Sequence, residues 1–316
     1  MHKLLANDGI DAQGKLLLEQ AGFFVSTEKV GQENLIKSIN ENNFTALTVR
    51  SATKVRKDVI DSCPGLKLIG RGGVGMDNID VEYAKSKGIN VVNTPAASSM
   101  SVAELVFAHL FSMVRFLTDS NRQMPLNGDI QFDVLKKKYA GGIELRGKTL
   151  GIIGFGRIGQ AVAKTGLGLG MKIIAHDPYL PEANIDIEIA GASKVTVKIK
   201  TTSFEEVLKN SDLLSLHVPG GSVISAKEFE LMKKGVGLVN ASRGGVINEK
   251  DLVNALNSGK VAYAALDVFE NEPKPAKELL SHPNISLTPH IGAATLEAQE
   301  RIGVELAEKI IAHFKG

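Results

Sequence analysis

The sequence predicts an α/β protein with two doubly wound parallel-sheet domains. Short apolar runs alternate with helical patterns along the 316 residues, and such alternation is typical of parallel sheets covered by helices on both faces. The alternation occurs in two successive series, and the chain is long enough for two domains. No close sequence repeat links the two series, so their similarity is architectural.

The first series of elements covers residues 1–98. Its expected strands are short, mostly apolar runs at 3–6, 23–25, 46–49, 66–69 and 90–92. Helical patterns between them cover 11–20, 32–40, 54–62 and 80–87. Gly22 and Gly88 follow two of these helices, and Pro64 ends a third. Ligands of such sheets lie beyond the carboxyl ends of the strands, so Arg50-Ser51 and the loop Arg71–Gly75 are candidate binding residues.

The longest helical pattern in the first half of the chain runs from Ser98 to Leu117. Ser101 and Glu104 have the spacing of a capping box, so we interpret Glu104 as a helix cap. The helix is apolar on more than one face, which predicts burial between domains or against another subunit. His109 within it is interpreted as a packed histidine, not a ligand. Residues 124–142 carry turn residues and the basic cluster 136–138, which we interpret as a solvated face.

A second series of elements begins at Leu150. Its expected strands are 150–153, 171–176, 212–216, 236–239, 261–266 and 285–287. Expected helices begin near 160 and cover 204–209, 226–233, 248–258 and 295–314. Residues 185–200 are β-branched and alternating, which indicates irregular or short strands.

A glycine turn joins the first strand and first helix of this second series. Gly154, Gly156 and Gly159 follow the G-x-G-x-x-G spacing: the first allows a tight turn, the second lets a pyrophosphate approach the backbone, and the third lets the helix pack against the strand. Asp177 follows the next strand, where a carboxylate binds both ribose hydroxyls and repels a 2′-phosphate. The turn therefore predicts an NAD site in a Rossmann-type domain; the alternative is a bare strand–turn–helix packing motif.

Composition excludes several classes of function. A net charge of +2 gives no large field for nucleic acid or a membrane, and aromatic residues at 5% offer few stacking platforms. Cys63 is the single cysteine, so no internal disulfide is expected, and no structural metal site is expected either. No signal peptide or membrane-spanning run is visible, which predicts a cytoplasmic enzyme.

Three side chains beyond strands of the second series have the chemistry that hydride transfer to a 2-oxo acid requires. The guanidinium of Arg243 would bind the substrate carboxylate, and the protonated imidazole of His290 would give its proton to the carbonyl oxygen. The carboxylate of Glu272 would fix the tautomer of that imidazole. Taken singly, each has another interpretation: a surface cation, a solvated loop acid and a helix cap. His217 also lies at a strand end, where it would line the cofactor groove.

These motifs together resemble the D-2-hydroxyacid dehydrogenase family over nearly the full chain. The matching segments are 49–54, 70–80, 154–159, 240–245, 265–269 and 289–294. The resemblance implies that Arg243, Glu272 and His290 are the catalytic set. It implies a flavodoxin-like substrate domain made of 1–98 and the returning segment 290–316, with the NAD-binding domain, 99–289, inserted between them. It also implies a homodimer formed through the cofactor domain.

The resemblance also assigns binding residues. The expected cofactor contacts are Val74, Gly154, Gly156, Arg157, Ile158, Gly159, Asp177, His217, Val218, Pro219, Ala241, Ser242, Arg243, Asp267, His290, Gly292 and Ala293. The expected substrate contacts are Arg50, Ser51, Arg71, Gly73, Val74, Arg243 and His290. No metal is expected.

Within the family, the chain looks most like short members that oxidise 3-phospho-D-glycerate and lack a C-terminal regulatory domain, so we expect no feedback inhibition by serine. Arg50 and Arg71 would then bind the phosphate; the alternative for Arg71 is to brace its own loop. Reduction of glyoxylate or hydroxypyruvate, or oxidation of another D-2-hydroxy acid, is the alternative activity. An NAD-sensing corepressor of the same fold is a remote one. The segment between Pro219 and Met232 is shorter than is usual, which would alter the adenosine groove.

Overall fold

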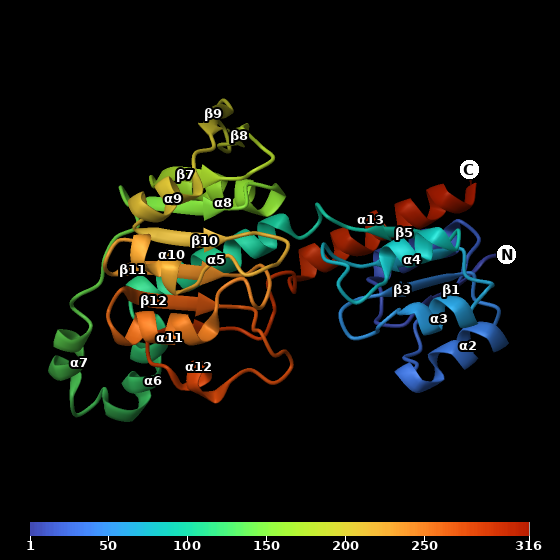
Figure 1. Cartoon of the computed structure of the whole chain (residues 1–316), viewed down its shortest axis with the longest axis horizontal. Helices are drawn as coiled ribbons and strands as arrows, with labels where there is room; N and C mark the ends of the chain where they lie inside the picture. Colours follow the sequence, from blue (N-terminus) through green and yellow to red (C-terminus); the bar gives the residue numbers. More distant parts are fainter. Residues whose placement is uncertain (316) are drawn as a thin grey trace. The chain divides into compact units, whose positions relative to one another are not determined.

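Two parallel sheets organise the chain, one in each of two compact units (Figure 1). The computed structural model describes residues 1–315. Unit 1 comprises Met1–Ser101 and the segment that begins at Ala293, and unit 2 comprises Val102–Gly292. The chain therefore leaves unit 1, completes unit 2 and returns; the expected boundaries were residues 98 and 289.

Unit 1 is built on a five-stranded sheet in the order β2-β1-β3-β4-β5, with all pairs parallel. Its elements are β1 (Lys3–Ala6), α1 (Ala12–Gln20), β2 (Phe24–Ser26), the 3-10 helix η1 (Gln32–Asn34), α2 (Leu35–Glu41), β3 (Ala46–Val49), α3 (Lys57–Ser62), β4 (Leu68–Arg71), α4 (Val81–Ser86), β5 (Asn90–Asn93) and α13 (Leu296–Lys315).

Helices cover both faces of this sheet because side chains of successive strand residues point to opposite sides. Leu5 of β1 belongs to a buried cluster with residues of α2, α3 and α4, whereas Leu4 belongs to one with residues of α1 and α13. The backbones of α1 and α13 meet at two glycines: a Cβ on Gly14 would lie 2.4 Å from the carbonyl oxygen of Gly303. The last helix of the chain is therefore part of the core of unit 1.

Unit 2 is built on a six-stranded parallel sheet in the order β13-β12-β11-β10-β6-β7. Its elements are most of α5 (Ser99–Val114), then α6 (Leu117–Asn127), α7 (Phe132–Lys138), β6 (Thr149–Ile153), α8 (Arg157–Gly168), β7 (Lys172–His176), β8 (Glu182–Ile187), β9 (Val195–Lys200), α9 (Phe204–Asn210), β10 (Leu213–Leu216), α10 (Ala226–Leu231), β11 (Val236–Asn240), α11 (Glu249–Asn257), β12 (Val261–Leu266), α12 (Lys277–Ser281) and β13 (Ile285–Leu287).

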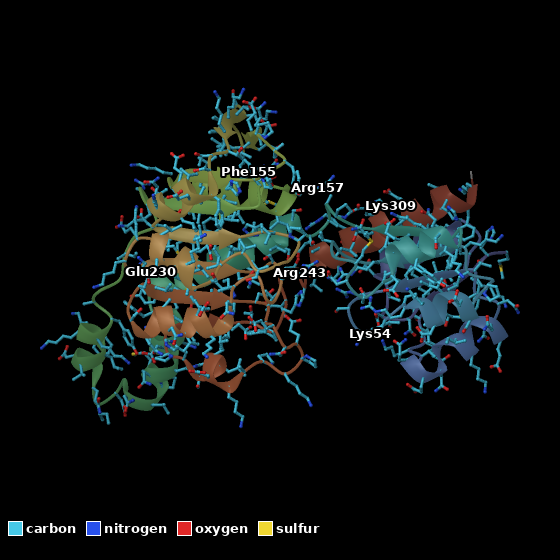
Figure 2. All side chains as sticks on the ribbon, viewed as in Figure 1. Lys54, Phe155, Arg157, Glu230, Arg243 and Lys309 are labelled. Carbon is cyan, nitrogen blue, oxygen red and sulfur yellow. The ribbon has the colours of Figure 1, made fainter. Side chains whose placement is uncertain are left out.

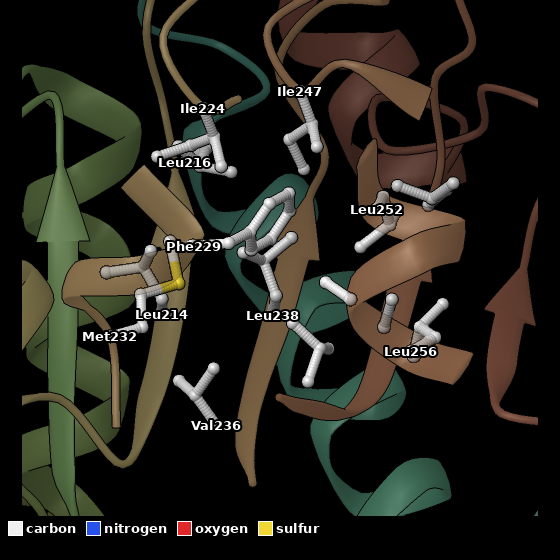
Figure 3. Packing of buried hydrophobic residues seen from close by; sticks show 14 of the residues in the cluster. Leu214, Leu216, Ile224, Phe229, Met232, Val236, Leu238, Ile247, Leu252 and Leu256 are labelled. Carbon is white, nitrogen blue, oxygen red and sulfur yellow. The ribbon is translucent and has the colours of Figure 1, made fainter. Parts of the chain in front are cut away.

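The two faces of this second sheet are also buried. Phe229 of α10 lies in one cluster with Leu216, Leu238 and Leu252, which joins the sheet to α10 and α11 (Figure 3). The other face packs against α5 and α8. The prediction of two doubly wound α/β domains is confirmed.

Several local predictions were wrong. The helix expected over 98–117 ends at Val114, because Phe116 adopts a left-handed backbone (φ 56°), and α6 and α7 follow where turns were expected. Ser101 lies inside α5, so the expected capping box at Ser101 and Glu104 does not form the helix start. The expectation of irregular or short strands over 185–200 is confirmed: β8 and β9 form a short antiparallel hairpin outside the main sheet.

Within residues 1–315, no single helix is long and apolar enough to cross a membrane, and α5 and α6 reach that length and composition only together, across a 56° bend. No group of three or more His, Cys, Asp or Glu side chains in the same residues is placed to hold a metal ion.

Candidate functional site

The expected site residues lie beyond the carboxyl ends of parallel strands in both units. In unit 2 they follow the strands of the parallel sheet: Gly154–Gly159 after β6, Asp177 after β7, His217–Pro219 after β10, Ala241–Arg243 after β11 and Asp267 after β12. His290 and Gly292 lie beyond β13. In unit 1, Arg50 and Ser51 follow β3, Arg71 ends β4, and Gly73 and Val74 come next. Ala293 begins the returning segment of unit 1.

The order of strands in unit 2 reverses between β6 and β10. From β6 the chain first builds β7 on one side and then crosses to β10 on the other. Ligands of doubly wound sheets bind at such a switch point. The glycine turn after β6 and His217 after β10 lie on either side of it.

The three glycines of the turn have three different environments. Gly154 has φ 88°, and a Cβ there would lie 2.3 Å from the carbonyl oxygen of His217; a Cβ on Gly159 would lie 2.2 Å from the carbonyl oxygen of Gly154. The fold itself therefore requires these two glycines. Gly156 has an ordinary φ of −70°, and a Cβ there would meet no atom within 4 Å. Since nothing in the protein explains the second glycine, its open space fits a pyrophosphate approaching the backbone.

Asp177 lies against this turn. One carboxylate oxygen accepts the backbone N–H of Phe155 at 2.8 Å, and the other accepts those of Tyr179 and Leu180. Arg157 starts α8 and is exposed (Figure 2). The carboxylate is thus fixed at the end of β7 by backbone donors, in the place that the ribose of a dinucleotide occupies in such folds.

His217 is a neutral histidine. Its backbone N–H donates to Ile153 at 2.7 Å, and its Nε2 lies 2.8 Å from the hydroxyl of Ser215. Nδ1 is buried and has no hydrogen-bond partner in the described part of the chain. Burial lowers the pKa of His217 from 6.5 to about 3, so the ring carries no charge near neutral pH.

His290 and Glu272 form a pair in unit 2. Nδ1 of His290 lies 2.8 Å from Oε2 of Glu272, and Oε1 of Glu272 accepts the backbone N–H of Phe269 at 3.0 Å. The side chains are 47% and 36% exposed, so the imidazole is accessible while its Nδ1 is held. Because Nδ1 is occupied by the carboxylate, Nε2 is the nitrogen able to exchange a proton with a ligand.

Arg243 is presented by a loop with its own internal bonds. The amide of Asn240 donates to the carbonyl of Arg243 at 2.9 Å and accepts from the backbone and hydroxyl of Ser242. One guanidinium nitrogen of Arg243 donates to the carbonyl of Ser242 at 2.7 Å. A Cβ on Gly244 would lie 1.9 Å from the carbonyl oxygen of Phe269, so this loop packs directly on the segment that leads to Glu272.

Asp267, expected to contact the cofactor, is 1% exposed and already has protein partners. Its carboxylate accepts the hydroxyl of Thr288 and the backbone N–H groups of Ile291 and Gly292 at 2.6–2.9 Å. The sequence analysis did not identify Thr288 as a site residue, although it directly follows β13, the position in which site residues of parallel sheets are expected.

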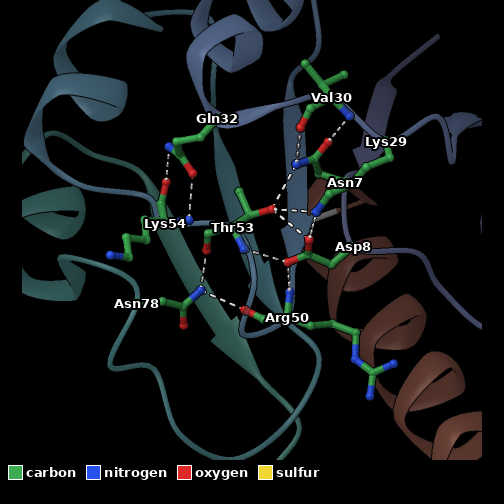
Figure 4. Close-up of polar contacts among 9 residues, drawn as sticks. All are labelled: Asn7, Asp8, Lys29, Val30, Gln32, Arg50, Thr53, Lys54 and Asn78. Atoms are coloured by element: carbon green, nitrogen blue, oxygen red, sulfur yellow. Dashed lines mark hydrogen bonds and ion pairs between the residues drawn. The ribbon is translucent and has the colours of Figure 1, made fainter. Parts of the chain in front are cut away.

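In unit 1, the strand order reverses between β1 and β3, and a depression of about 500 Å³ lies there. The carboxylate of Asp8 accepts the backbone N–H groups of Arg50 and Thr53, the hydroxyl of Thr53 and the ammonium of Lys29 (Figure 4). These bonds, with burial opposing them, hold the pKa of Asp8 below its usual 3.8. Sequence reasoning missed Asp8, although it follows the strand next to the one that carries Arg50.

The two arginines of unit 1 that were expected to bind the phosphate differ in the partners of their side chains. Figure 4 shows the guanidinium of Arg50 pointing away from Asp8, and within residues 1–315 it has no hydrogen bond or ion pair. Arg71 instead donates to the carbonyl of Gly72 and lies over Gly73, where a Cβ would meet its Nη1. Arg71 therefore braces its own loop, the alternative that the sequence left open, and Arg50 remains available for a ligand.

Comparison with known proteins places this geometry in a family. Residues 107–292 match the sequence model of the D-isomer specific 2-hydroxyacid dehydrogenase, NAD binding domain. A hydroxypyruvate reductase of Thermotoga maritima is 43% identical over 98% of this chain and 97% of its own. The chain belongs to the D-isomer specific 2-hydroxyacid dehydrogenase family. The resemblance seen in the sequence is thereby confirmed, and NAD is its cofactor.

Two further members of the dehydrogenase family show the range of its substrates. A D-3-phosphoglycerate dehydrogenase of Methanocaldococcus jannaschii is 42% identical over all of this chain, which spans 58% of the length of that relative. A solved glyoxylate reductase of Paecilomyes thermophila superposes with a TM-score of 0.79 at 31% identity and covers 98% of this chain and 94% of its own. NAD, when bound, accepts or supplies the hydride in this chemistry.

Proposed function

We propose that this dehydrogenase oxidises 3-phospho-D-glycerate to 3-phosphooxypyruvate, the entry step to serine. His290 takes the proton of the substrate hydroxyl at Nε2, Glu272 stabilises the imidazolium that forms, and Arg243 binds the carboxylate. Arg50 binds the phosphate. In the reverse direction His290 returns the proton to the carbonyl oxygen.

The observation that carries the choice of substrate is the uncommitted guanidinium of Arg50. Its backbone is fixed by Asp8, yet its side chain has no partner in the described residues. An unpaired guanidinium whose backbone is fixed at a topological switch point is suited to a dianionic group, which it can bind through two parallel hydrogen bonds. The phosphoglycerate dehydrogenases among the relatives agree with this choice.

The test compares Arg50→Ala with the unaltered enzyme on 3-phospho-D-glycerate and on D-glycerate, with NAD in both assays. We expect kcat/KM to fall at least about tenfold more for the phosphorylated substrate, because charge-assisted hydrogen bonds contribute about 1.5–3 kcal/mol. Arg56→Ala is the matched control, since Arg56 is already paired with Asp80 at 2.9 Å. Equal losses on both substrates would contradict the phosphate role.

The second candidate is the reduction of hydroxypyruvate, and one observation favours it. Arg71, the second cation expected at the phosphate, is committed to its own loop. A hydroxypyruvate reductase is also among the relatives, with nearly full coverage of both chains. A higher kcat/KM for hydroxypyruvate with NADH than for 3-phosphooxypyruvate with NADH would select this activity. Turnover of neither pair would leave glyoxylate or another D-2-hydroxy acid as the substrate, or a non-enzymatic NAD-binding role, the remote alternative.

A further inference from the structure

Four polar side chains of unit 2 form a hydrogen-bonded series, in which His109 and Asp267 are buried and Ser286 and Thr288 are half-buried. Ser286 Oγ lies 2.8 Å from Nδ1 of His109, and Nε2 of His109 lies 3.0 Å from Oγ1 of Thr288. The hydroxyl of Thr288 lies 2.6 Å from Asp267. His109 is 4% exposed and comes from α5, whereas Ser286 lies in β13, Thr288 follows β13 and Asp267 follows β12.

The hydrogen-bond donors of these four side chains are all directed toward Asp267. A carboxylate only accepts, so the single hydroxyl proton of Thr288 is directed to Asp267. Oγ1 of Thr288 must then accept from His109, which places the ring proton on Nε2. Burial lowers the pKa of His109, although the charge of Asp267 opposes this, so the ring is neutral and Nδ1 accepts the hydroxyl proton of Ser286. Every member is satisfied, and such chains polarise toward their acceptor.

The acceptor of this series holds the turn that carries His290. The carboxylate of Asp267 binds the N–H groups of Ile291 and Gly292, the two residues that follow His290. His290 itself has φ 57°, a left-handed conformation that non-glycine residues keep only where their surroundings impose it. Asp267 thus fixes the backbone directly after His290, while Glu272 binds the imidazole ring.

We propose that His109 and Thr288 are positioning residues for His290: they orient Asp267, which holds the left-handed turn that aims the imidazole at the substrate. This proposal rests on the proposed role of His290 as the group that exchanges the proton. It gives a function in the reaction to a buried histidine on α5 that touches neither substrate nor cofactor.

The main test is the pair Thr288→Val and Thr288→Ser. Valine keeps the shape of threonine but leaves both His109 and Asp267 without their partner, whereas serine retains the hydroxyl. In the protein without ligands, we expect Thr288→Val to speed hydrogen exchange of the Ile291 and Gly292 amides selectively. Its kcat should fall by up to about 10²-fold, as for a small misplacement of a reacting group, and Thr288→Ser should recover most of it.

The control is Ser211→Ala, which removes a buried hydroxyl of unit 2 that donates only to the carbonyl of Val207. It should lower thermal stability without changing exchange at Ile291 and Gly292. Should Thr288→Val fail to fold, His109→Leu and His109→Gln make the same comparison, since only glutamine can still donate to Thr288. The expected result is then a lower kcat and faster exchange of the Ile291 and Gly292 amides in His109→Leu, with both largely restored in His109→Gln.

Three results would overturn the proposal. Unchanged exchange at Ile291 and Gly292 in Thr288→Val would show that these hydrogen bonds do not hold the turn after His290. Faster exchange with unaltered kcat would show that the turn does not position His290. A rise in the KM for NAD alone would assign Asp267 to cofactor binding instead. Because exchange is measured without substrate, failure of the proposed substrate leaves this part of the test intact.

Discussion

Glu272 and His290 are 18 positions apart in the sequence, and Oε2 of one lies 2.8 Å from Nδ1 of the other. The second oxygen of Glu272 is bound to the backbone N–H of Phe269, so the carboxylate cannot turn without losing a bond. Glu272 therefore holds the imidazole at Nδ1 and leaves Nε2 for the reaction.

Replacing members of this pair should reduce turnover in a graded way. For His290→Ala we expect a fall in kcat of about 10²–10⁴, the usual contribution of general acid–base catalysis. Glu272→Gln should lose less, because the amide oxygen still accepts from Nδ1 although it no longer stabilises an imidazolium. Binding of NADH, followed by its fluorescence, should be unaffected in Glu272→Gln. Turnover like that of the unaltered enzyme in His290→Ala would remove His290 from the mechanism.

The glycines of the dinucleotide turn should separate into two classes when each is changed to alanine. Gly156→Ala should leave thermal stability nearly unchanged, because its Cβ meets no atom within 4 Å, but it should weaken NADH binding. Gly159→Ala should destabilise unit 2 by about 1–3 kcal/mol, since its Cβ would lie 2.2 Å from a carbonyl oxygen. Thermal melts with and without NADH measure both effects. Intact NADH affinity in Gly156→Ala would show that the pyrophosphate does not approach there.

The buried imidazole of His217 should make the protein sensitive to mild acid. Its pKa is about 3 in the folded protein and 6.5 is its ordinary value, so the unfolded chain binds a proton first as pH falls. The stability that neutral His217 contributes is complete above pH 6.5 and is lost progressively toward pH 3. Between pH 7.5 and 5 this amounts to up to about 2 kcal/mol. Urea unfolding at the two pH values should show a smaller difference in His217→Gln; equal differences would contradict the burial of the ring.

A homodimer, expected from the sequence, has a candidate surface on α6, α7 and the turn between them. Leu126, Ile130, Phe132 and Val134 are all more than half exposed there, and Ile130 is 74% exposed. Exposed large apolar side chains gathered in so short a segment are typical of a protein interface. We predict that the unaltered chain sediments as a dimer and that Ile130→Asp with Phe132→Asp sediments as a monomer. Leu280→Asp, on exposed α12 of the same unit, should remain dimeric. A dimer in the double variant would place the interface elsewhere.

The sequence predicted the parts of the fold that depend on local patterns. The glycine spacing and Asp177 predicted the dinucleotide turn of unit 2, because the backbone requires Gly154 and Gly159 and because backbone donors hold Asp177. The helices α6 and α7 were missed, since Pro125 and the polar residues around it have the composition of a turn. The break at Phe116 depends on a left-handed residue that no local pattern indicated.

Contacts between distant residues were harder to predict. The pairing of Glu272 with His290 followed from family resemblance, not from spacing. His109 was interpreted as a packed histidine, and its burial is confirmed. Its hydrogen bonds could not be foreseen, because Ser286 and Thr288 lie more than 170 residues further along the chain. The commitment of Arg71 to its own loop likewise depends on a backbone shape at Gly73 (φ 137°) that the sequence alone does not give.

The place of α13 in the core of unit 1 has a consequence for how the protein is made. The helix fills the face of the sheet beside α1, and the two backbones touch at Gly14 and Gly303. α13 follows unit 2 in the sequence, so one face of the sheet of unit 1 stays uncovered by this helix while unit 2 is being synthesised. Unit 2 can close earlier, since its two ends meet where Gly292 faces Val102. We expect the inserted unit to reach its native structure before the unit that begins the chain, the reverse of the usual order of domains during translation.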